Sequence, residues 1–174
     1  MSNTILTGEA AADILAAMQK AGLNGWEMFV PEGVEEIAPG AFAGMKNLRR
    51  VQLPKTLRKI GAIAFYGCEN LTQITLPAGL VELGTAAFKN SGLQEVSVPT
   101  RALKLGCEVF ADSALRCAEI KGRQTGEAMF RGCRQLTKLQ LNSNTRKIEA
   151  GMFRDCAALK TLRLPEKLEQ IGIE

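Results

Sequence analysis

The side chains of this 174-residue sequence that could act as nucleophiles or metal ligands are mainly cysteines, because the chain has five cysteines and no histidine. The lack of histidine excludes Ser-His-Asp and Cys-His nucleophilic sites, histidine general bases and every histidine-containing metal site. No two cysteines have the C-x-x-C spacing typical of zinc ligands, and an odd number fits free thiols in a reducing compartment better than a disulfide framework. We expect no metal and no other cofactor. The cysteines are Cys68, Cys107, Cys117, Cys133 and Cys156.

Acid–base and phosphate chemistry have no better candidates. Glu35 and Glu36 are neighbours, and in an extended segment their side chains would face opposite ways. A glycine-rich phosphate loop is also missing, since the glycines recur at fixed places in a repeated phrase. The sequence therefore predicts a protein that is not an enzyme.

The repeated phrase is easiest to follow through its phenylalanines, which are spaced by 23, 23, 22, 20 and 23 residues. Self-similarity at such a period is typical of a solenoid, in which no single unit can bury its apolar side alone. The residues concerned are Phe42, Phe65, Phe88, Phe110, Phe130 and Phe153. We expect them to stack on one another in the interior.

Each unit follows the order L-x-x-V-x-L-P-x-x-L-x-x-I-G-x-x-A-F-x-x-C. The V-x-L step has period two and predicts a strand with two inward side chains. Proline then ends the strand, and the glycine after Ile60, Leu83 and Leu105 suggests a bend. The last slot holds Cys68, Cys133 and Cys156, which are predicted to be buried thiols. Cys117 should point outward, either as a modifiable thiol or as an accidental surface cysteine.

These residues resemble the BspA-type leucine-rich repeat, a bacterial and protist branch of the leucine-rich repeat superfamily, over residues 25–172. The resemblance implies a curved right-handed solenoid with a parallel strand on the concave face of every coil and short strands or helical turns on the convex face. It also implies binding to macromolecules. Coils are expected at 25–47, 48–70, 71–92, 93–114, 115–135, 136–158 and, incomplete, 159–174. The shortened unit at 115–135 and the stretch "LNSNTRKIEAGMF" depart from the phrase and predict an irregular convex side.

The N-terminal leader, residues 1–24, is predicted to be a helical cap on a solenoid domain of residues 25–174. Residues 7–22 form an amphipathic pattern with Thr7 as N-cap, Ile14, Leu15 and Met18 on the apolar side, and Gly22 as the stop. A membrane-binding or partner-binding helix is the alternative. At the other end, the unfinished coil 159–174 would expose a strand edge and favours self-association.

Charge divides the chain unevenly within a formal net charge of +4. Residues 1–120 hold 11 basic and 12 acidic residues, whereas residues 121–174 hold 11 and 6. An acidic ligand, polysaccharide or nucleic acid, would be attracted by the C-terminal third, although basic tracts that bind nucleic acid are usually denser, so nucleic acid is not the expected partner. The residues concerned are Arg131, Arg134, Lys138, Arg146, Lys147, Arg154, Lys160 and Arg163.

Outward side chains of the predicted strands form columns on the concave face, and they are the candidate binding residues. A stiff sheet of mixed polar side chains can make hydrogen bonds with little ordering cost, and aromatic and arginine residues often anchor interfaces. The candidates are Trp26, Phe29, Arg49, Arg50, Gln52, Gln73, Thr75, Glu95, Ser97, Arg116, Glu119, Lys138, Gln140, Lys160 and Arg163. The expected function is a non-catalytic protein-interaction module with a protein partner. The alternatives are acidic-ligand binding and a purely structural spacer or fragment of a longer repeat protein.

No export signal precedes the repeats, because Asp13 interrupts the apolar run "AAADILAAM". No stretch approaches the roughly 20 apolar residues of a membrane span. These features slightly favour the cytoplasm, with the cell surface or secretion as the expectation for a fragment of a longer protein.

Overall fold

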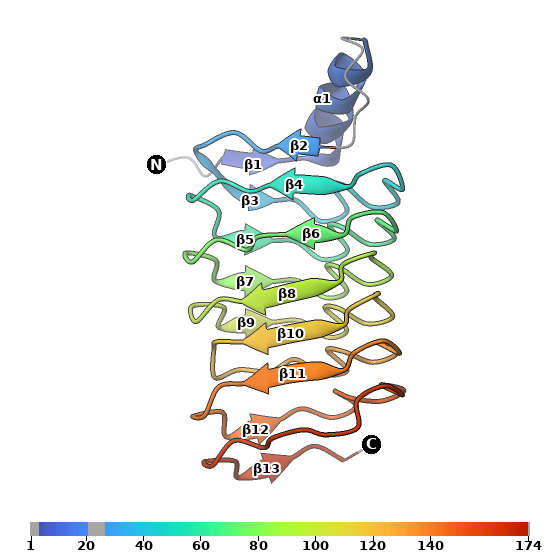
Figure 1. Ribbon diagram of the computed structural model, residues 1–174. Coiled ribbons are helices and arrows are strands. Elements are labelled where there is room, and N and C mark those ends of the chain that lie inside the picture. Colours follow the sequence, from blue (N-terminus) through green and yellow to red (C-terminus); the bar gives the residue numbers. More distant parts are fainter. Residues whose placement is uncertain (1–3, 21–26, 174) are drawn as a thin grey trace.

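The computed structural model describes residues 4–20 and 27–173, and it is a stack of coils with one helix at its N-terminal end (Figure 1). Each of the first six coils contributes one strand to a front layer, and most coils contribute a second strand to a back layer. Every strand pairing is parallel. The predicted parallel-strand solenoid is confirmed. The front strands are β2 (Glu27–Phe29), β4 (Arg50–Gln52), β6 (Gln73–Ile74), β8 (Glu95–Val98), β10 (Cys117–Ile120) and β11 (Lys138–Leu141).

The back layer is a five-stranded sheet followed by a separate two-stranded sheet. The first has the order β1-β3-β5-β7-β9 and the second pairs β12 with β13. Their bounds are β1 (Thr4–Leu6), β3 (Val34–Ile37), β5 (Lys59–Ile60), β7 (Glu82–Leu83), β9 (Lys104–Leu105), β12 (Lys147–Ile148) and β13 (Gln170–Ile171). The interruption falls in the shortened unit, where the sequence predicted irregularity.

Thr125 explains how the chain crosses this interruption. It occupies the slot that Ile60 and Leu83 fill in other coils, and its side chain is buried. The Thr125 hydroxyl donates to the carbonyl of Lys147 at 3.1 Å and accepts the N–H of Glu149 at 3.3 Å. A side chain therefore replaces part of the backbone ladder between these two coils.

The core is a column of phenylalanine rings along the axis of the stack. Phe42, Phe65, Phe88, Phe110 and Phe130 are fully buried, and their neighbouring ring centroids lie 4.9, 5.1, 5.5 and 5.7 Å apart with nearly parallel planes. Offset stacking at such distances adds to the burial of each ring. The predicted interior stack is confirmed for these five rings, while Phe153 is half-buried.

The glycines after Ile60, Leu83 and Leu105 serve close approach between coils rather than a bend. None of Gly61, Gly84 and Gly106 has a positive φ angle. A Cβ on Gly61 would lie 2.5 Å from the Pro39 nitrogen, and one on Gly84 would lie 2.4 Å from the Ala62 nitrogen. The sequence analysis assigned these glycines to a bend, and that reason was wrong. Glycine is required here because the backbones of successive coils leave no room for a side chain.

Two turn positions in each of the first six coils adopt the left-handed conformation. The second is held by glycine, asparagine or aspartate, such as Gly67, Asn90 and Asp112, which are the residues that tolerate it best. The first of the two positions also holds residues whose side chains make the left-handed conformation sterically unfavourable, including Ile63 with a φ angle of 50°. The solenoid thus carries local strain that its stacking interactions offset.

Replacing Ile63 with glycine is expected to raise the free energy of unfolding by about 1 kcal/mol, because it removes a β-branched residue from a left-handed position. Little burial is lost, since Ile63 is 45% exposed. Urea denaturation followed by circular dichroism measures the change. The control is Thr85→Gly, an exposed position without positive φ, which should lose stability; a loss at both sites would contradict the strain argument.

The N-terminal helix α1 (Gly8–Lys20) begins at the predicted N-cap. The Thr7 hydroxyl accepts the N–H of Ala10 at 3.2 Å, which satisfies one of the free donors of the first turn. Ala10, Ala11 and Ile14 pack against the core, and the rest of the helix stands out from the end of the stack (Figure 1). The first two turns of the helix cover the first coil. The predicted stop at Gly22 and the side chains of Leu15 and Met18 lie outside the described residues.

A strand before the helix was not expected from the sequence. β1 pairs in parallel with β3, and the N–H of Ala38 donates to the carbonyl of Leu6 at 2.9 Å. The leader therefore covers the first coil with a strand as well as a helix.

Candidate functional site

The front layer presents one continuous set of outward side chains, which we call the strand face: the outward residues of β2, β4, β6, β8, β10 and β11. Register pairs Phe29 with Gln52 and Arg50 with Gln73. Cys117 pairs with Glu95 on one side and with Lys138 on the other. In the next column, Glu119 pairs with Ser97 and Gln140. The structure thus brings these predicted residues together in columns.

The remaining candidates lie beside the strands rather than in them. Arg49 and Arg116 directly precede β4 and β10, and Thr75 directly follows β6. Lys160 and Arg163 are exposed, but the strand predicted for their coil is missing, since residues 159–164 form no strand. Leu164 is 48% exposed, whereas Val98, which occupies the equivalent position in β8, is fully buried. The segment therefore lacks this inward contact. Trp26 lies outside the described residues.

The front layer is split between β6 and β8 into the ladders β2-β4-β6 and β8-β10-β11. The turn before β8 is one residue shorter than the turn before β6, because Leu93 follows Phe88 by five residues whereas Leu71 follows Phe65 by six. Ile74, whose counterparts Val51 and Val96 are buried, is half-buried at this split. The split therefore opens an apolar spot in an otherwise polar face.

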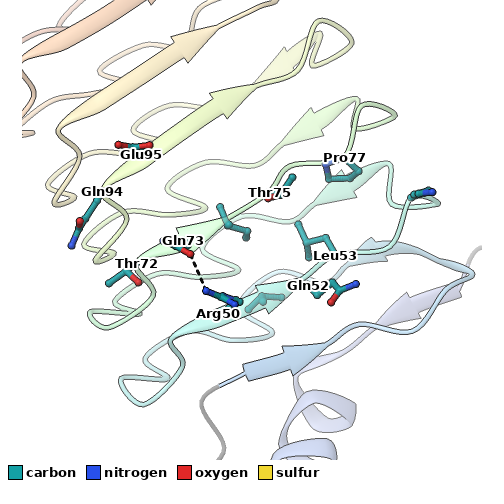
Figure 2. Close-up of a pocket in the computed structure, with 12 residues that line it drawn as sticks. Arg50, Gln52, Leu53, Thr72, Gln73, Thr75, Pro77, Gln94 and Glu95 are labelled. Atoms are coloured by element: carbon teal, nitrogen blue, oxygen red, sulfur yellow. Dashed lines mark hydrogen bonds between the residues drawn. The ribbon is translucent and has the colours of Figure 1, made fainter.

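A shallow hollow of about 920 Å³ lies over β4, β6 and the start of β8. Figure 2 shows Arg50, Gln52, Gln73 and Thr75 along it, with Gln94 and Glu95 on the neighbouring coil. A second hollow of about 530 Å³ continues over β8, β10 and β11. Both are lined by Ile74 and Glu95. We call the two together the strand-face groove.

Several side chains of the groove are tied to neighbours within the chain. Arg50 forms an ion pair with Glu27 at 3.4 Å and donates to the Gln73 amide oxygen at 3.1 Å. The Ser97 hydroxyl donates to the Glu119 carboxylate at 2.9 Å, and Lys121 lies 3.6 Å from the same carboxylate. These contacts hold the polar side chains in place. In the described ranges, by contrast, Glu95 and Lys138 form neither an ion pair nor a side-chain hydrogen bond.

The predicted basic surface is partly neutralised. Four of its eight residues form ion pairs: Arg131 with Glu108, Arg146 with Glu169, Lys147 with Glu149 and Arg154 with Asp155. No ion pair involves Arg134, Lys138, Lys160 or Arg163 within the part of the chain that the structure covers. Half of the candidate basic residues therefore already have an acidic neighbour within the chain.

Three cysteines confirm the predicted buried slot and add a role that the sequence did not reveal. The thiols of Cys68, Cys133 and Cys156 each donate at 3.1 Å to the carbonyl of a phenylalanine in the preceding coil. Burial raises the pKa of the Cys68 and Cys156 thiols to about 12 and also raises the pKa of Cys133. These thiols are structural hydrogen-bond donors.

The other two cysteines lie outside the buried slot. Cys117 faces outward between Glu95 and Lys138, and its side chain is half-buried. Cys107 is exposed. Desolvation, followed by the nearby carboxylates of Glu127 and Glu108, raises the pKa of the Cys107 thiol. A raised pKa lowers the thiolate fraction and with it the reactivity.

Alkylation should separate the two groups of thiols. Cys68, Cys133 and Cys156 are expected to react with iodoacetamide at pH 8 at least about tenfold more slowly than Cys117, because they are buried and their thiolates are disfavoured. Mass spectrometry of timed digests measures the rates. In urea all five should react alike, and fast labelling of Cys68 in the folded protein would contradict the assignment.

The described residues hold no cluster of three or more histidine, cysteine, aspartate or glutamate side chains arranged for a metal ion. Over the same ranges, no helix has the length and apolar character needed to cross a membrane.

Comparison with solved structures gives several similar folds. A leucine-rich repeat protein from Bacteroides ovatus has a TM-score of 0.73 at 27% identity, covering 84% of this chain and 39% of that one. The T. pallidum leucine-rich repeat protein has a TM-score of 0.70 at 30% identity, with 76% and 64% covered. A leucine-rich cell surface protein from Faecalibacterium prausnitzii, at 24% identity and a TM-score of 0.57, shares the fold over 84% of this chain and 31% of its own. The chain thus spans less than two thirds of each of these proteins.

Among curated proteins, none matches the sequence. The family model of the BspA type leucine rich repeat region matches residues 22–126 and 122–174, which together span the coils described above. The family that the sequence resembles is therefore the one to which the chain belongs: the BspA-type leucine-rich repeat proteins.

Proposed function

We propose that this chain is a non-catalytic protein-interaction module and that a protein partner binds in the strand-face groove. The observation that carries the proposal is the groove itself. It combines an apolar spot at Ile74 with the unpaired charges of Glu95 and Lys138 on a hydrogen-bonded framework. Partly exposed apolar surface ringed by polar groups is typical of interaction sites.

The rigidity of the groove supports this function. Parallel ladders fix the backbone on both sides of the split, and the contacts of Arg50, Gln73, Ser97 and Glu119 fix side chains before a partner arrives. Preordered side chains lose little conformational entropy on binding. The shallow, open form of the groove suits a macromolecule better than a small substrate, which usually needs an enclosing pocket.

A blocking substitution tests the proposal. Thr75→Arg places a long side chain in the groove, while Thr85→Arg makes the same change on an exposed turn outside it. Zero-length cross-linking in extracts of the source cells, followed by mass spectrometry, should give cross-links near the groove that Thr75→Arg abolishes and Thr85→Arg preserves. Cross-links that survive Thr75→Arg and disappear with Thr85→Arg would contradict the proposal.

Salt dependence separates this function from acidic-ligand binding. Release of counterions makes binding to a polyanion fall steeply with ionic strength, whereas a groove that presents open charges of both signs should show a weaker dependence. A purely structural spacer would show no partner at the groove.

Self-association is a second candidate, favoured by the exposure of Leu164 and Ile171, which are 48% and 55% exposed in the last coil. Exposed apolar side chains next to the β13 edge could be covered by a second copy. Light scattering over a concentration series should then show dimers that Leu164→Glu weakens, and a monomer at every concentration would contradict this candidate.

A further inference from the structure

We infer that the partner of the strand-face groove is an extended polypeptide segment that crosses the front strands. A basic side chain of this segment pairs with Glu95, and an acidic side chain pairs with Lys138. This inference rests on the proposed function and names the chemistry of its ligand. It rests on three observations: the register of the strands, the absence of ion pairs at Glu95 and Lys138 within the described ranges, where other charges are paired, and the shape of the groove.

Register sets the distance between the two open charges. Glu95 and Lys138 stand in one column, separated by Cys117. Neighbouring parallel strands lie roughly 4.8 Å apart, so the two backbone positions are about 10 Å apart. An extended chain advances about 3.3 Å per residue. Side chains that face the same way alternate along an extended chain, so the basic and acidic residues of the segment should be two or four positions apart.

Elsewhere, opposite charges in neighbouring coils neutralise one another. On the back layer, Lys59 lies 3.1 Å from Glu36 and 3.7 Å from Glu82, and Glu82 lies 3.8 Å from Lys104. These pairs are one coil apart. Glu95 and Lys138 are two coils apart, with an uncharged cysteine between them, so they cannot reach each other in this way. The column therefore leaves one group of each sign open to a partner.

Small side chains keep the space between the two charges free. Ser97, Cys117 and Ala118 line the hollow of about 530 Å³ between Glu95 and Lys138. Ile74, one coil before Glu95, offers an apolar contact to a neighbouring side chain of the segment. Amide groups of Gln52, Gln73 and Gln94 line the adjoining hollow and can both donate to and accept from a peptide backbone.

The two signs favour a polypeptide over other polymers. A nucleic acid or an acidic polysaccharide carries one sign of charge and would meet the carboxylates of Glu95 and Glu119 in the same groove. A peptide can place opposite charges at a defined spacing. Mixed charges of this kind mainly provide specificity, because each exposed pair contributes modest affinity.

A library of linear twelve-residue peptides displayed on phage, selected on the full chain, tests the inference. The enriched families should carry Lys or Arg and Asp or Glu two or four positions apart. A synthetic peptide of the leading family should bind with an affinity that Glu95→Gln and Lys138→Gln each lower about five- to tenfold. The matched controls Asp13→Asn and Lys20→Gln on α1, both exposed, should leave the affinity unchanged.

Exchanging the two charges is the most specific test of the inference. The double variant Glu95→Lys with Lys138→Glu should lose the leading peptide and bind the same peptide with its two charges exchanged. Enrichment of peptides that Thr75→Arg blocks but that lack the charge pair, or ignore both glutamine variants, would overturn this inference and leave the proposed function standing. Peptides that neither Thr75→Arg nor the charge variants affect would count against both. A selection without enrichment would overturn the inference in favour of a folded partner surface.

Discussion

Replacing Phe88 with alanine is expected to lower the free energy of unfolding by about 3 to 5 kcal/mol, the usual cost of truncating a buried phenylalanine. The Phe88 ring is fully buried, and its centroid lies 5.1 Å from that of Phe65 and 5.5 Å from that of Phe110. Because a coil contacts only its neighbours, the substitution weakens both of the interfaces that its coil makes. Urea denaturation followed by circular dichroism measures the loss.

Tyr66→Ala is the matched control, because it removes an aromatic ring next to the stack but outside it. Tyr66 is 39% exposed, and its hydroxyl accepts a single side-chain hydrogen bond from Asn90 at 3.2 Å. A cost of no more than about 1 kcal/mol is expected, as for most surface substitutions. Equal costs for Phe88→Ala and Tyr66→Ala would mean that the stack contributes no more than surface packing.

The features that the sequence predicted well are those that every coil repeats. The phenylalanine spacing located the interior stack, and the slot shared by Cys68, Cys133 and Cys156 located buried thiols, because each depends on the same contact to the previous coil. The N-cap at Thr7 was also predictable, since capping is local chemistry. Repetition turns a weak single signal into a reliable one.

The features that were missed arise where neighbouring coils differ. The split between β6 and β8 could not be predicted, because strand pairing depends on two neighbouring coils and neither coil reveals it alone. The Thr125 hydroxyl contacts depend on a coil about 22 residues away. A usable signal did exist for the left-handed turns, because one slot holds only glycine, asparagine or aspartate, as at Gly67, Asn90 and Asp112.

The candidate site shows the same limit. Alternation along the strands correctly placed Arg50, Glu95 and Lys138 on one face. Which of these charges remain open could not be predicted, because Arg50 finds Glu27 one coil away whereas Glu95 meets the uncharged Cys117. The composition of a column predicts a surface, and the order of charges along it decides what the surface can bind.

Gly84→Ala is expected to cost roughly 3 kcal/mol or more, although it adds a single methyl group, because overpacking against backbone is poorly relieved. The new Cβ would lie 2.4 Å from the Ala62 nitrogen and 2.6 Å from the Gly61 carbonyl carbon. The coils would have to separate, which weakens the hydrogen bond from the Gly84 N–H to the Ile60 carbonyl, now 2.8 Å. Denaturation of the variant measures the loss of stability.

A side chain does occupy this slot in the sixth coil, where Glu149 stands in the equivalent position. There the back layer is interrupted between β9 and β12, and the Glu149 N–H bonds to the Thr125 hydroxyl instead of a backbone carbonyl. Gly122→Ala is the control, because its Cβ would meet atoms no closer than 3.5 Å, an ordinary contact, and its cost should stay below about 1 kcal/mol. Equal stability of Gly84→Ala and the parent protein would mean that the coils separate without loss, and the tight spacing of the back layer would then contribute nothing to the stability of the stack.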